Sequence, residues 1–245
     1  TNDYLGCVSP NFIAHASLAP NDIYYRDING APQICGNGTI QFECLYGLKQ
    51  NRINAEKAWD SATGTGITVA VLDTGINFGH EDVPLIKNNL NEIVNNHMDD
   101  DNNGFIDDIR GWDFINNDND PTDDHVKDFI FHGSHVSGII GAMGNNSVGI
   151  IGVAYMANIL PLKVLDNNGS GDSCTIVRAI NYAADNGARV INLSLGVVVS
   201  PETADILACG TDPTSANYSF VNAINYAREK GCILVAAAGN ANSNV

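Results

Sequence analysis

Three polar side chains that lie far apart in the sequence have the types and positions that acid–base chemistry requires. Asp73 directly follows the apolar, β-branched run 67–72, and Asn240 lies just after the apolar run 232–238. Open parallel sheets form their sites at the carboxyl ends of such buried strands. His132 precedes a stretch of small and apolar residues whose spacing predicts the start of a helix. Each feature alone is more typical of a structural core, so their combination carries the argument.

The elements that must position these side chains alternate along the chain. Buried strands are predicted at 67–72, 159–164, 190–193 and 233–237. Helices are predicted from Asn54, which is a candidate N-cap, from His132, and at about 174–186 and 218–230, where Gly187 and Gly231 are typical terminators. Strand and helix alternating at this spacing predict an α/β fold, a doubly wound parallel sheet with helices on both faces.

Four motifs in this chain together resemble the subtilisin-like serine proteases, the subtilases. They occur in the family order at 71–75, 132–138, 192–196 and 236–240. The resemblance implies a serine-type endopeptidase with an Asp-His-Ser triad. In it, Asp73 orients the imidazole, His132 is the general base and Asn240 donates a hydrogen bond to the oxyanion. Ser134 stands where the family usually has threonine.

The serine of that triad has no counterpart in the sequence. The family places it in a Gly-Thr-Ser-like motif, which does not occur between Thr1 and Val245, while Ser134 and Ser194 lie inside motifs with other roles. We therefore expect a subtilisin-like fold truncated on its C-terminal side, inactive alone, with the serine beyond Val245. The alternatives are a catalytically inactive peptide-binding module and a calcium-binding structural domain. Both leave the retention of all three polar site residues unexplained.

The resemblance also implies polypeptide substrates, bound as an additional strand between two segments that we call the rails. Glycine in a rail leaves room for the approaching peptide backbone. Without the resemblance, 169–171 would be interpreted as a flexible loop. The expected rail residues are Ser194, Leu195, Gly196, Gly169, Ser170 and Gly171.

Acidic residues cluster between Asp99 and Asp128, and the first part of this cluster resembles half of a calcium loop. Its oxygen side chains, followed by Gly104 at the sixth position, match the front of an EF-hand, and hard oxygen ligands favour calcium. The twelfth position is Arg110, so the bidentate carboxylate must come from elsewhere. The expected ligands are Asp99, Asp101 and Asn103, with Asp107 or Asp108 as the bidentate group. A solvated acidic loop is the alternative.

A second calcium site is implied by the resemblance alone. Its side-chain ligands would be Asp82 and Asn146, with carbonyl groups from 144–150. The remaining ligand would come from the amino-terminal segment, where Gln41 is one candidate.

Composition limits the remaining possibilities. Apolar residues make up 44% of the 245 residues, enough for one α/β domain with a substantial core. The net charge of −16 argues against a nucleic-acid partner, and no apolar run reaches the ~18 residues of a membrane span. Among six cysteines, Cys35 and Cys44 have a spacing that suits a small closed loop, and Cys174 or Cys232 is expected to be a buried free thiol.

The resemblance divides the chain into three parts. Residues 1–17 are similar to the end of an inhibitory propeptide, 18–53 form a linker and extension, and 54–245 form the amino-terminal part of the catalytic domain. An ordinary amino-terminal arm is the alternative for 1–17. By resemblance the protein is a secreted zymogen inhibited by its own propeptide, although the sequence contains no signal peptide.

Overall fold

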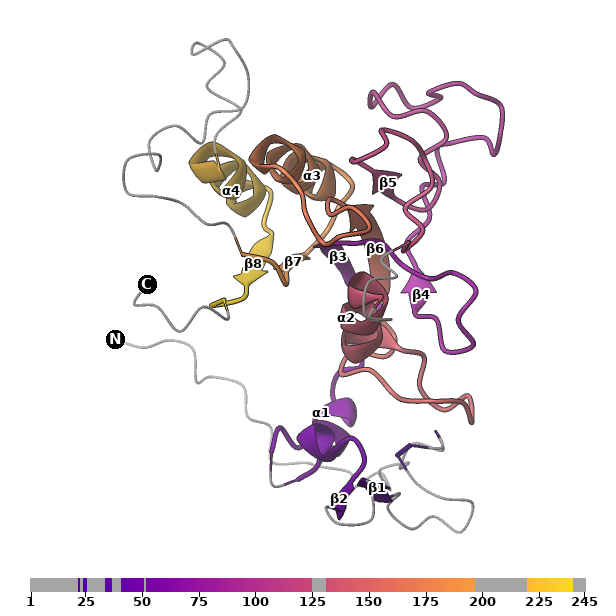
Figure 1. Ribbon diagram of the computed structural model, residues 1–245, viewed down its shortest axis with the longest axis vertical. Helices are drawn as coiled ribbons and strands as arrows, with labels where there is room; N and C mark the ends of the chain where they lie inside the picture. Colours follow the sequence, from indigo (N-terminus) through magenta and orange to yellow (C-terminus); the bar gives the residue numbers. More distant parts are fainter. Residues whose placement is uncertain are drawn as a thin grey trace.

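The computed structural model describes residues 22, 24–25, 34–36, 41–50, 52–124, 131–196 and 220–239. Its main feature is a sheet in the order β4-β6-β3-β7-β8, with β5 paired to β6 (Figure 1). All pairings in this sheet are parallel. The strands are β3 (Thr68–Asp73), β4 (Leu85–Ile86), β5 (Trp112–Asp113), β6 (Asn158–Lys163), β7 (Val190–Leu193) and β8 (Ile233–Ala236). The predicted parallel α/β sheet is therefore confirmed.

Strand β3 lies inside the sheet and is covered on both faces, since all six of its residues are buried. Ala70 and Leu72 belong to the core that includes α3 (Ser173–Asp185) and α4 (Phe220–Glu229). Val69 and Val71 belong to a second core, on the side of α2 (His132–Gly141). Figure 1 shows α3 and α4 side by side and α2 apart from them. This arrangement confirms helices on both faces.

The helix ends agree with the sequence signals at most positions. Asp172 caps α3, because its side chain accepts a hydrogen bond from Thr175 N at 2.9 Å. Gly187 and Gly231 follow α3 and α4 with φ of 77° and 87°, a conformation that glycine adopts without strain. Asn54 is the N-cap of α1 (Ala55–Trp59), but it is left-handed and its side chain makes no capping bond. The predicted side-chain cap there is wrong.

The amino-terminal part contributes its own packing. Strands β1 (Ile34–Gly36) and β2 (Gln41–Glu43) form an antiparallel pair, followed by the short 3-10 helix η1 (Tyr46–Leu48). Tyr25 and Leu48 share a small core with Ala55 and Ile151. The 18–53 range, expected as linker and extension, thus contains structure that packs on the domain. The predicted propeptide end, 1–17, lies outside the described residues.

Among the cysteines whose side chains the structure describes, two are disulfide-bonded and one is free. Cys44 and Cys174 each take part in a disulfide bond. Cys232 is a buried free thiol whose Sγ lies 3.0 Å from the carbonyl oxygen of Ala188. The prediction of a buried free thiol at Cys174 or Cys232 is therefore confirmed, at Cys232.

The outer edge of the sheet is exposed, and none of the described helices has the character of a membrane span. β8 is the outermost strand of the described sheet, and its Ile233 and Val235 side chains are 65% and 48% exposed. Within the described ranges, no helix has both the length and the apolarity needed to cross a membrane.

Candidate active site

The end of β3 and the start of α2 bring the predicted aspartate and histidine together. His132 Nδ1 lies 2.7 Å from Asp73 Oδ1, and Thr74 N donates to the same oxygen at 2.8 Å. A carboxylate only accepts hydrogen bonds, so Nδ1 is the donor and Nε2 of the neutral imidazole is left as the basic nitrogen. The Asp73 side chain is fully buried and that of His132 is 40% exposed. This pair suits an imidazole base that is oriented from the protein side.

Burial governs the charge of Asp73. It raises the pKa of the carboxyl above its ordinary value, whereas the hydrogen bonds from His132 and Thr74 oppose that rise. Oδ2 of Asp73 is buried without a hydrogen-bond partner among the described residues. The carboxylate therefore depends on a few donors in a region of low dielectric, where each bond is electrostatically strong.

Close packing of two glycines sets the position of α2 on the Asp73 loop. A Cβ on Gly133 would lie 2.3 Å from the carbonyl oxygen of Gly75. Gly133 N also donates to Thr74 Oγ1 at 2.8 Å. Gly75 has a φ of 106°, and a Cβ there would lie 2.5 Å from Pro121 O. The helix can approach the loop this closely because Gly133 lacks a side chain, and the segment at Pro121 can do so because Gly75 lacks one.

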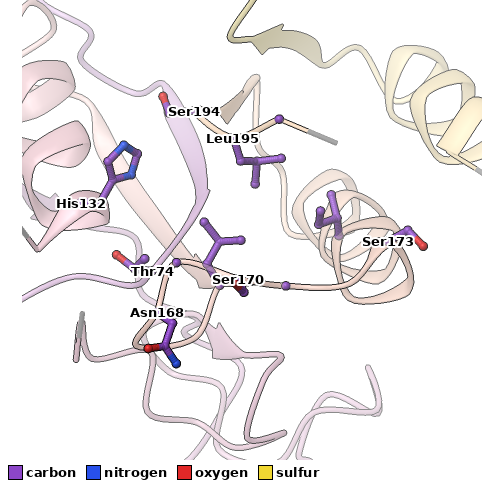
Figure 2. A pocket seen from close by; sticks show the side chains of 12 residues that line it. Thr74, His132, Asn168, Ser170, Ser173, Ser194 and Leu195 are labelled. Carbon is purple, nitrogen blue, oxygen red and sulfur yellow. The ribbon is translucent and has the colours of Figure 1, made fainter. Parts of the chain in front are cut away.

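A cleft of about 560 Å³ opens beside His132 and contains all six predicted rail residues (Figure 2). It also includes Thr74, next to the buried aspartate. Its lining is Thr74, His132, Leu165, Asn168, Gly169, Ser170, Gly171, Ser173, Ile176, Ser194, Leu195 and Gly196. The structure thus places both rails and the base around one space.

The 166–170 turn is held in a defined shape. Asp166 Oδ1 accepts from Asn168 N at 2.8 Å and from Ser170 N at 2.9 Å. The bond from Ser170, and after it the bond from Asn168, holds the pKa of Asp166 below its ordinary value. A Cβ on Gly171 would lie 2.0 Å from Val164 O, so that glycine is required by packing. At Gly196 a Cβ would meet no described atom within 4 Å. Glycine there leaves open space on the cleft side.

Sequence reasoning missed Lys163, which is almost fully buried and pairs in register with Asp73 across β3 and β6. Its Nζ donates to Thr74 O at 2.9 Å, to Leu165 O at 3.0 Å and to Asp124 Oδ1 at 2.6 Å. Three bonds satisfy the ammonium group and join the aspartate loop to the start of a rail. The available signal was a lysine inside an otherwise apolar strand.

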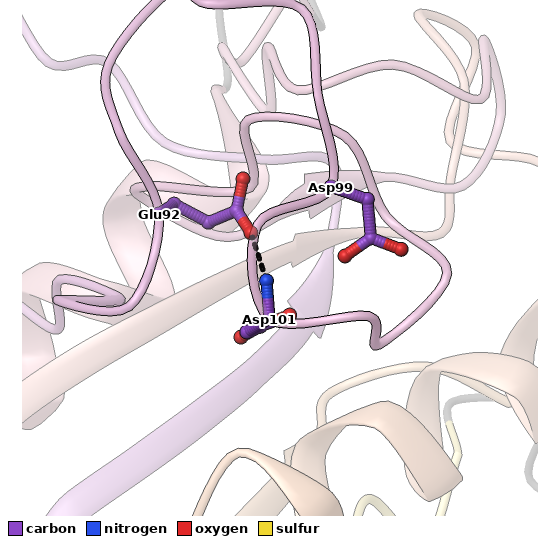
Figure 3. Close-up of side chains that lie close together, drawn as sticks. All are labelled: Glu92, Asp99 and Asp101. Carbon is purple, nitrogen blue, oxygen red and sulfur yellow. Dashed lines mark hydrogen bonds between the residues drawn. The ribbon is translucent and has the colours of Figure 1, made fainter.

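In the acidic segment, a ligand atom from each of Glu92, Asp99 and Asp101 lies within 4.8 Å of the others (Figure 3). Glu92 Oε1 accepts from the backbone N–H groups of Asp100 and Asp101 at 2.9 and 3.1 Å. Oε2 accepts from Asp107 N at 3.0 Å. Glu92 was not among the predicted ligands, because it lies seven residues before the motif.

The other predicted ligands of this segment are engaged within the protein. Asp107 accepts from Asn96 N and His97 N at 3.1 and 2.9 Å. Asp108 Oδ2 accepts from Tyr182 Oη at 2.6 Å and from Asn103 Nδ2 at 2.9 Å. Burial raises the pKa of Asp108, and these bonds oppose that rise. Asp107, Asp108 and Asn103 thus shape the loop around the three-carboxylate group.

The predicted site at Asp82 gains a residue from the amino-terminal segment. Asp82 accepts from Ile150 N at 2.7 Å and from Asn146 Nδ2 at 3.3 Å. Asp22 accepts from Asn145 N at 2.9 Å, while its Oδ1 is buried with no hydrogen bond among the described residues. Burial raises the pKa of Asp22, and the Asp82 charge adds to this effect. Asp22 therefore lies close enough to Asp82 for their charges to interact, whereas the side chain of Gln41, the predicted candidate, lies outside the described residues.

The remaining predicted site residue, Asn240, lies outside the described residues. A family model described as the subtilase family matches residues 64–245. The chain belongs to the subtilase family.

Individual proteases that are similar to this subtilase support the same family assignment. A thermophilic serine proteinase of Bacillus sp. (strain AK1) is 35% identical over 244 residues, which cover 99% of this chain and 46% of that protein. Thermitase of Thermoactinomyces vulgaris is 36% identical over 222 residues, covering 91% and 58%. A solved protease structure from Pseudoalteromonas arctica PAMC 21717 has a TM-score of 0.61 and 29% identity, covering 91% of this chain and 60% of that one. The chain spans about half the length of the curated relatives it matches.

Proposed function

We propose that the complete polypeptide is a serine endopeptidase, and that the chain 1–245 carries its base, its orienting aspartate and its substrate cleft. The carrying observation is the 2.7 Å contact between His132 Nδ1 and Asp73 Oδ1 at the edge of a cleft lined by both rails. In this proposal the polypeptide beyond Val245 contributes the nucleophilic serine. By itself, the chain 1–245 is inactive in triad catalysis.

The reaction uses His132 twice. Its Nε2 takes the hydroxyl proton as the serine oxygen bonds to the substrate carbonyl carbon, and it returns that proton to the nitrogen as the C–N bond breaks. Water then hydrolyses the ester by the same proton path, which releases the acid and restores the serine. Asp73 holds the tautomer and stabilises the imidazolium. Asn240 donates its amide hydrogen to the oxyanion, a contribution worth about 10²–10³ in turnover in comparable sites.

The substrate is an extended polypeptide that adds a strand between 194–196 and 169–171. The open space at Gly196 and the fixed turn at 166–170 support this mode, because a backbone needs close approach on one side and a stable edge on the other.

The test uses the complete native polypeptide, a serine-directed fluorophosphonate and a peptide substrate. We expect covalent labelling and turnover, and a loss of about 10⁴ in kcat for Asp73→Asn, as for other triads. His135→Ala is the matched control, since His135 lies on the same helix, is exposed and does not line the described cleft. Peptide binding without labelling or turnover would instead identify a catalytically inactive peptide-binding module.

Structural calcium is part of the proposal. Three carboxylates that converge at Glu92, Asp99 and Asp101 repel one another, and a hard divalent cation with oxygen ligands would offset this repulsion. At the second site, Asp22 Oδ1 is buried without a hydrogen bond among the described residues and the nearby Asp82 charge repels it, so a cation would also offset repulsion there. The residues therefore fit calcium, whose role here would be to stabilise loops. Calcium titration of Asp99→Asn and Asp82→Asn variants, followed by calorimetry, tests each site.

We also propose that the protein is secreted as a zymogen whose inhibitory propeptide ends near residue 17. Disulfide bonding at Cys44 and, separately, at Cys174 supports an oxidising compartment. Amino-terminal sequencing of the mature enzyme from culture medium tests both points. A mature protein that retains residues 1–17 would contradict the propeptide assignment.

A further inference from the structure

The segment 121–124 lies beside the loop that follows Asp73. Ile76 N donates to Pro121 O at 3.0 Å, and Asp123 N donates to Ile76 O at 3.0 Å. These two backbone bonds form a parallel bridge between Ile76 and Thr122. Asp123 is only 4% exposed. A buried carboxylate is thereby fixed to the loop that carries the catalytic aspartate.

The same carboxylate holds the first turn of α2. Asp123 Oδ2 accepts from Ser134 N at 3.0 Å and from Ser134 Oγ at 2.6 Å. Ser134 Oγ in turn accepts from Asn77 N at 2.8 Å. The donors at the start of a helix have no partners within the helix, and a carboxylate there also complements the helix dipole.

The N-cap residue of α2 does not supply this cap. Phe131 has a φ of 33° and makes no side-chain capping bond in the described structure. A left-handed conformation is unfavourable for a bulky residue, so the entry to the helix depends on contacts from elsewhere. Asp123 provides such a contact from the segment that precedes the helix, eleven positions before Ser134.

We propose that Asp123 is a positioning residue for His132. Asp123 binds both α2 and the loop that follows Asp73, and it thereby fixes the distance between them. The inference rests on the proposed peptidase function. Asp123 is not among the described residues that line the cleft. Its effect must therefore pass through the His132–Asp73 geometry and not through substrate contact.

This role predicts a specific kinetic pattern in the complete polypeptide. Asp123→Ala removes both bonds to Ser134 and should lower kcat by about 10²-fold, the effect expected of ~1 Å misplacement, with KM within about 3-fold of the original. Asp123→Asn keeps an acceptor oxygen for Ser134 and should recover most of this loss. Asp120→Ala is the matched control, because Asp120 directly precedes this segment, is exposed, and accepts a hydrogen bond from the Thr122 hydroxyl.

Two measurements make the test independent of folding and of the proposed function. Active-site titration with the phosphonate counts competent molecules, so unfolded protein does not enter kcat. The low-field proton resonance of the His132–Asp73 hydrogen bond reports the geometry without turnover. We expect Asp123→Ala to weaken or abolish this resonance and Asp123→Asn to retain it.

Several outcomes would overturn the proposal. One is an Asp123→Ala enzyme with kcat within about 3-fold of the original and an intact resonance. A second is a KM that changes as much as kcat does. A third is a loss of kcat that Asp123→Asn does not recover. If Asp123→Ala does not fold, Ser134→Ala, which removes the hydroxyl bond to Asp123 and the bond from Asn77 N, must show the same loss of kcat with little change in KM. An unmodified polypeptide that neither labels nor turns over would refute the peptidase function, and the resonance would still decide the role of Asp123.

Discussion

Substituting Gly133 by alanine tests whether glycine contact sets the catalytic geometry. The added Cβ would lie 2.3 Å from Gly75 O and 3.1 Å from Asp73 Cβ, whereas real Cβ contacts stay above 3.0 Å. Gly75 O is a backbone atom and cannot rotate away. The start of α2 must therefore move from the Asp73 loop by about 0.7 Å or more, since close-packed interiors absorb little strain.

That movement acts directly on the pair of catalytic residues. His132 precedes Gly133, so its Nδ1 would retreat from Asp73 Oδ1 and lengthen the 2.7 Å hydrogen bond to about 3.4 Å, where such bonds are weak. Misplacement on this scale lowers turnover by about 10²-fold. Overpacking of the buried contact should also destabilise the fold by about 1–3 kcal/mol.

Gly138→Ala, in the same helix, is the matched control. Its new Cβ would meet only the Ile150 side chain, at an ordinary 3.7 Å, and alanine in a helix interior is favoured over glycine by about 1 kcal/mol. Measurements of kcat, KM and thermal unfolding on the complete polypeptides should show loss at Gly133 and none at Gly138. Full activity of Gly133→Ala, or equal losses at both positions, would refute the reasoning.

Three further predictions concern the cleft, the acidic loop and the metal sites. Asp166→Ala frees the 166–170 turn and should raise KM about 3- to 10-fold with little change in kcat, measured by steady-state kinetics; a kcat effect alone would contradict it. The pKa of Tyr182 is raised well above its ordinary 10.0 by burial and the Asp108 carboxylate, so the unfolded chain loses this proton first and stability falls as pH rises above about 10. Tyr182→Phe should reduce that alkaline loss by up to about 1.4 kcal/mol per pH unit in denaturant titrations, and an unchanged slope would exclude the tyrosine. Asp22→Asn should diminish the rise of Tm on adding calcium; a rise equal to that of the original protein would remove Asp22 from the metal site.

Hydrophobic periodicity was sufficient to predict the fold, because buried strands can be recognised directly as apolar runs in the sequence. β3 and β6 are covered on both faces, which requires almost continuous apolar runs, and β7 was predicted with its observed bounds. Gly187 and Gly231 marked helix ends because their left-handed backbone strongly favours glycine. The short motifs identified His132 and Asp73 for a related reason. Each lies at the end of one predictable element.

Residues that act between elements were not accessible in this way. Asp123 meets Ser134 across eleven positions and Asp22 meets Asn145 across 123, and no local pattern encodes either contact. Asn54 shows the opposite failure. Its type and position indicated a side-chain cap, but its backbone is left-handed and its side chain makes no capping bond.

The two ends of α2 are held by different contacts, so changes at each end should have different effects on stability and turnover. Its start is held by Asp123 and by Gly133 on the Asp73 loop. The chain leaving its end returns through 144–150, where Asp82 accepts from Ile150 N and leaves no space for a Cβ on Gly149, at 2.4 Å. Calcium at Asp82 would order the segment 144–150. As chelator is added, Tm should therefore fall at lower chelator concentrations than kcat does. Gly133→Ala, at the start of α2, should instead lower kcat and Tm together.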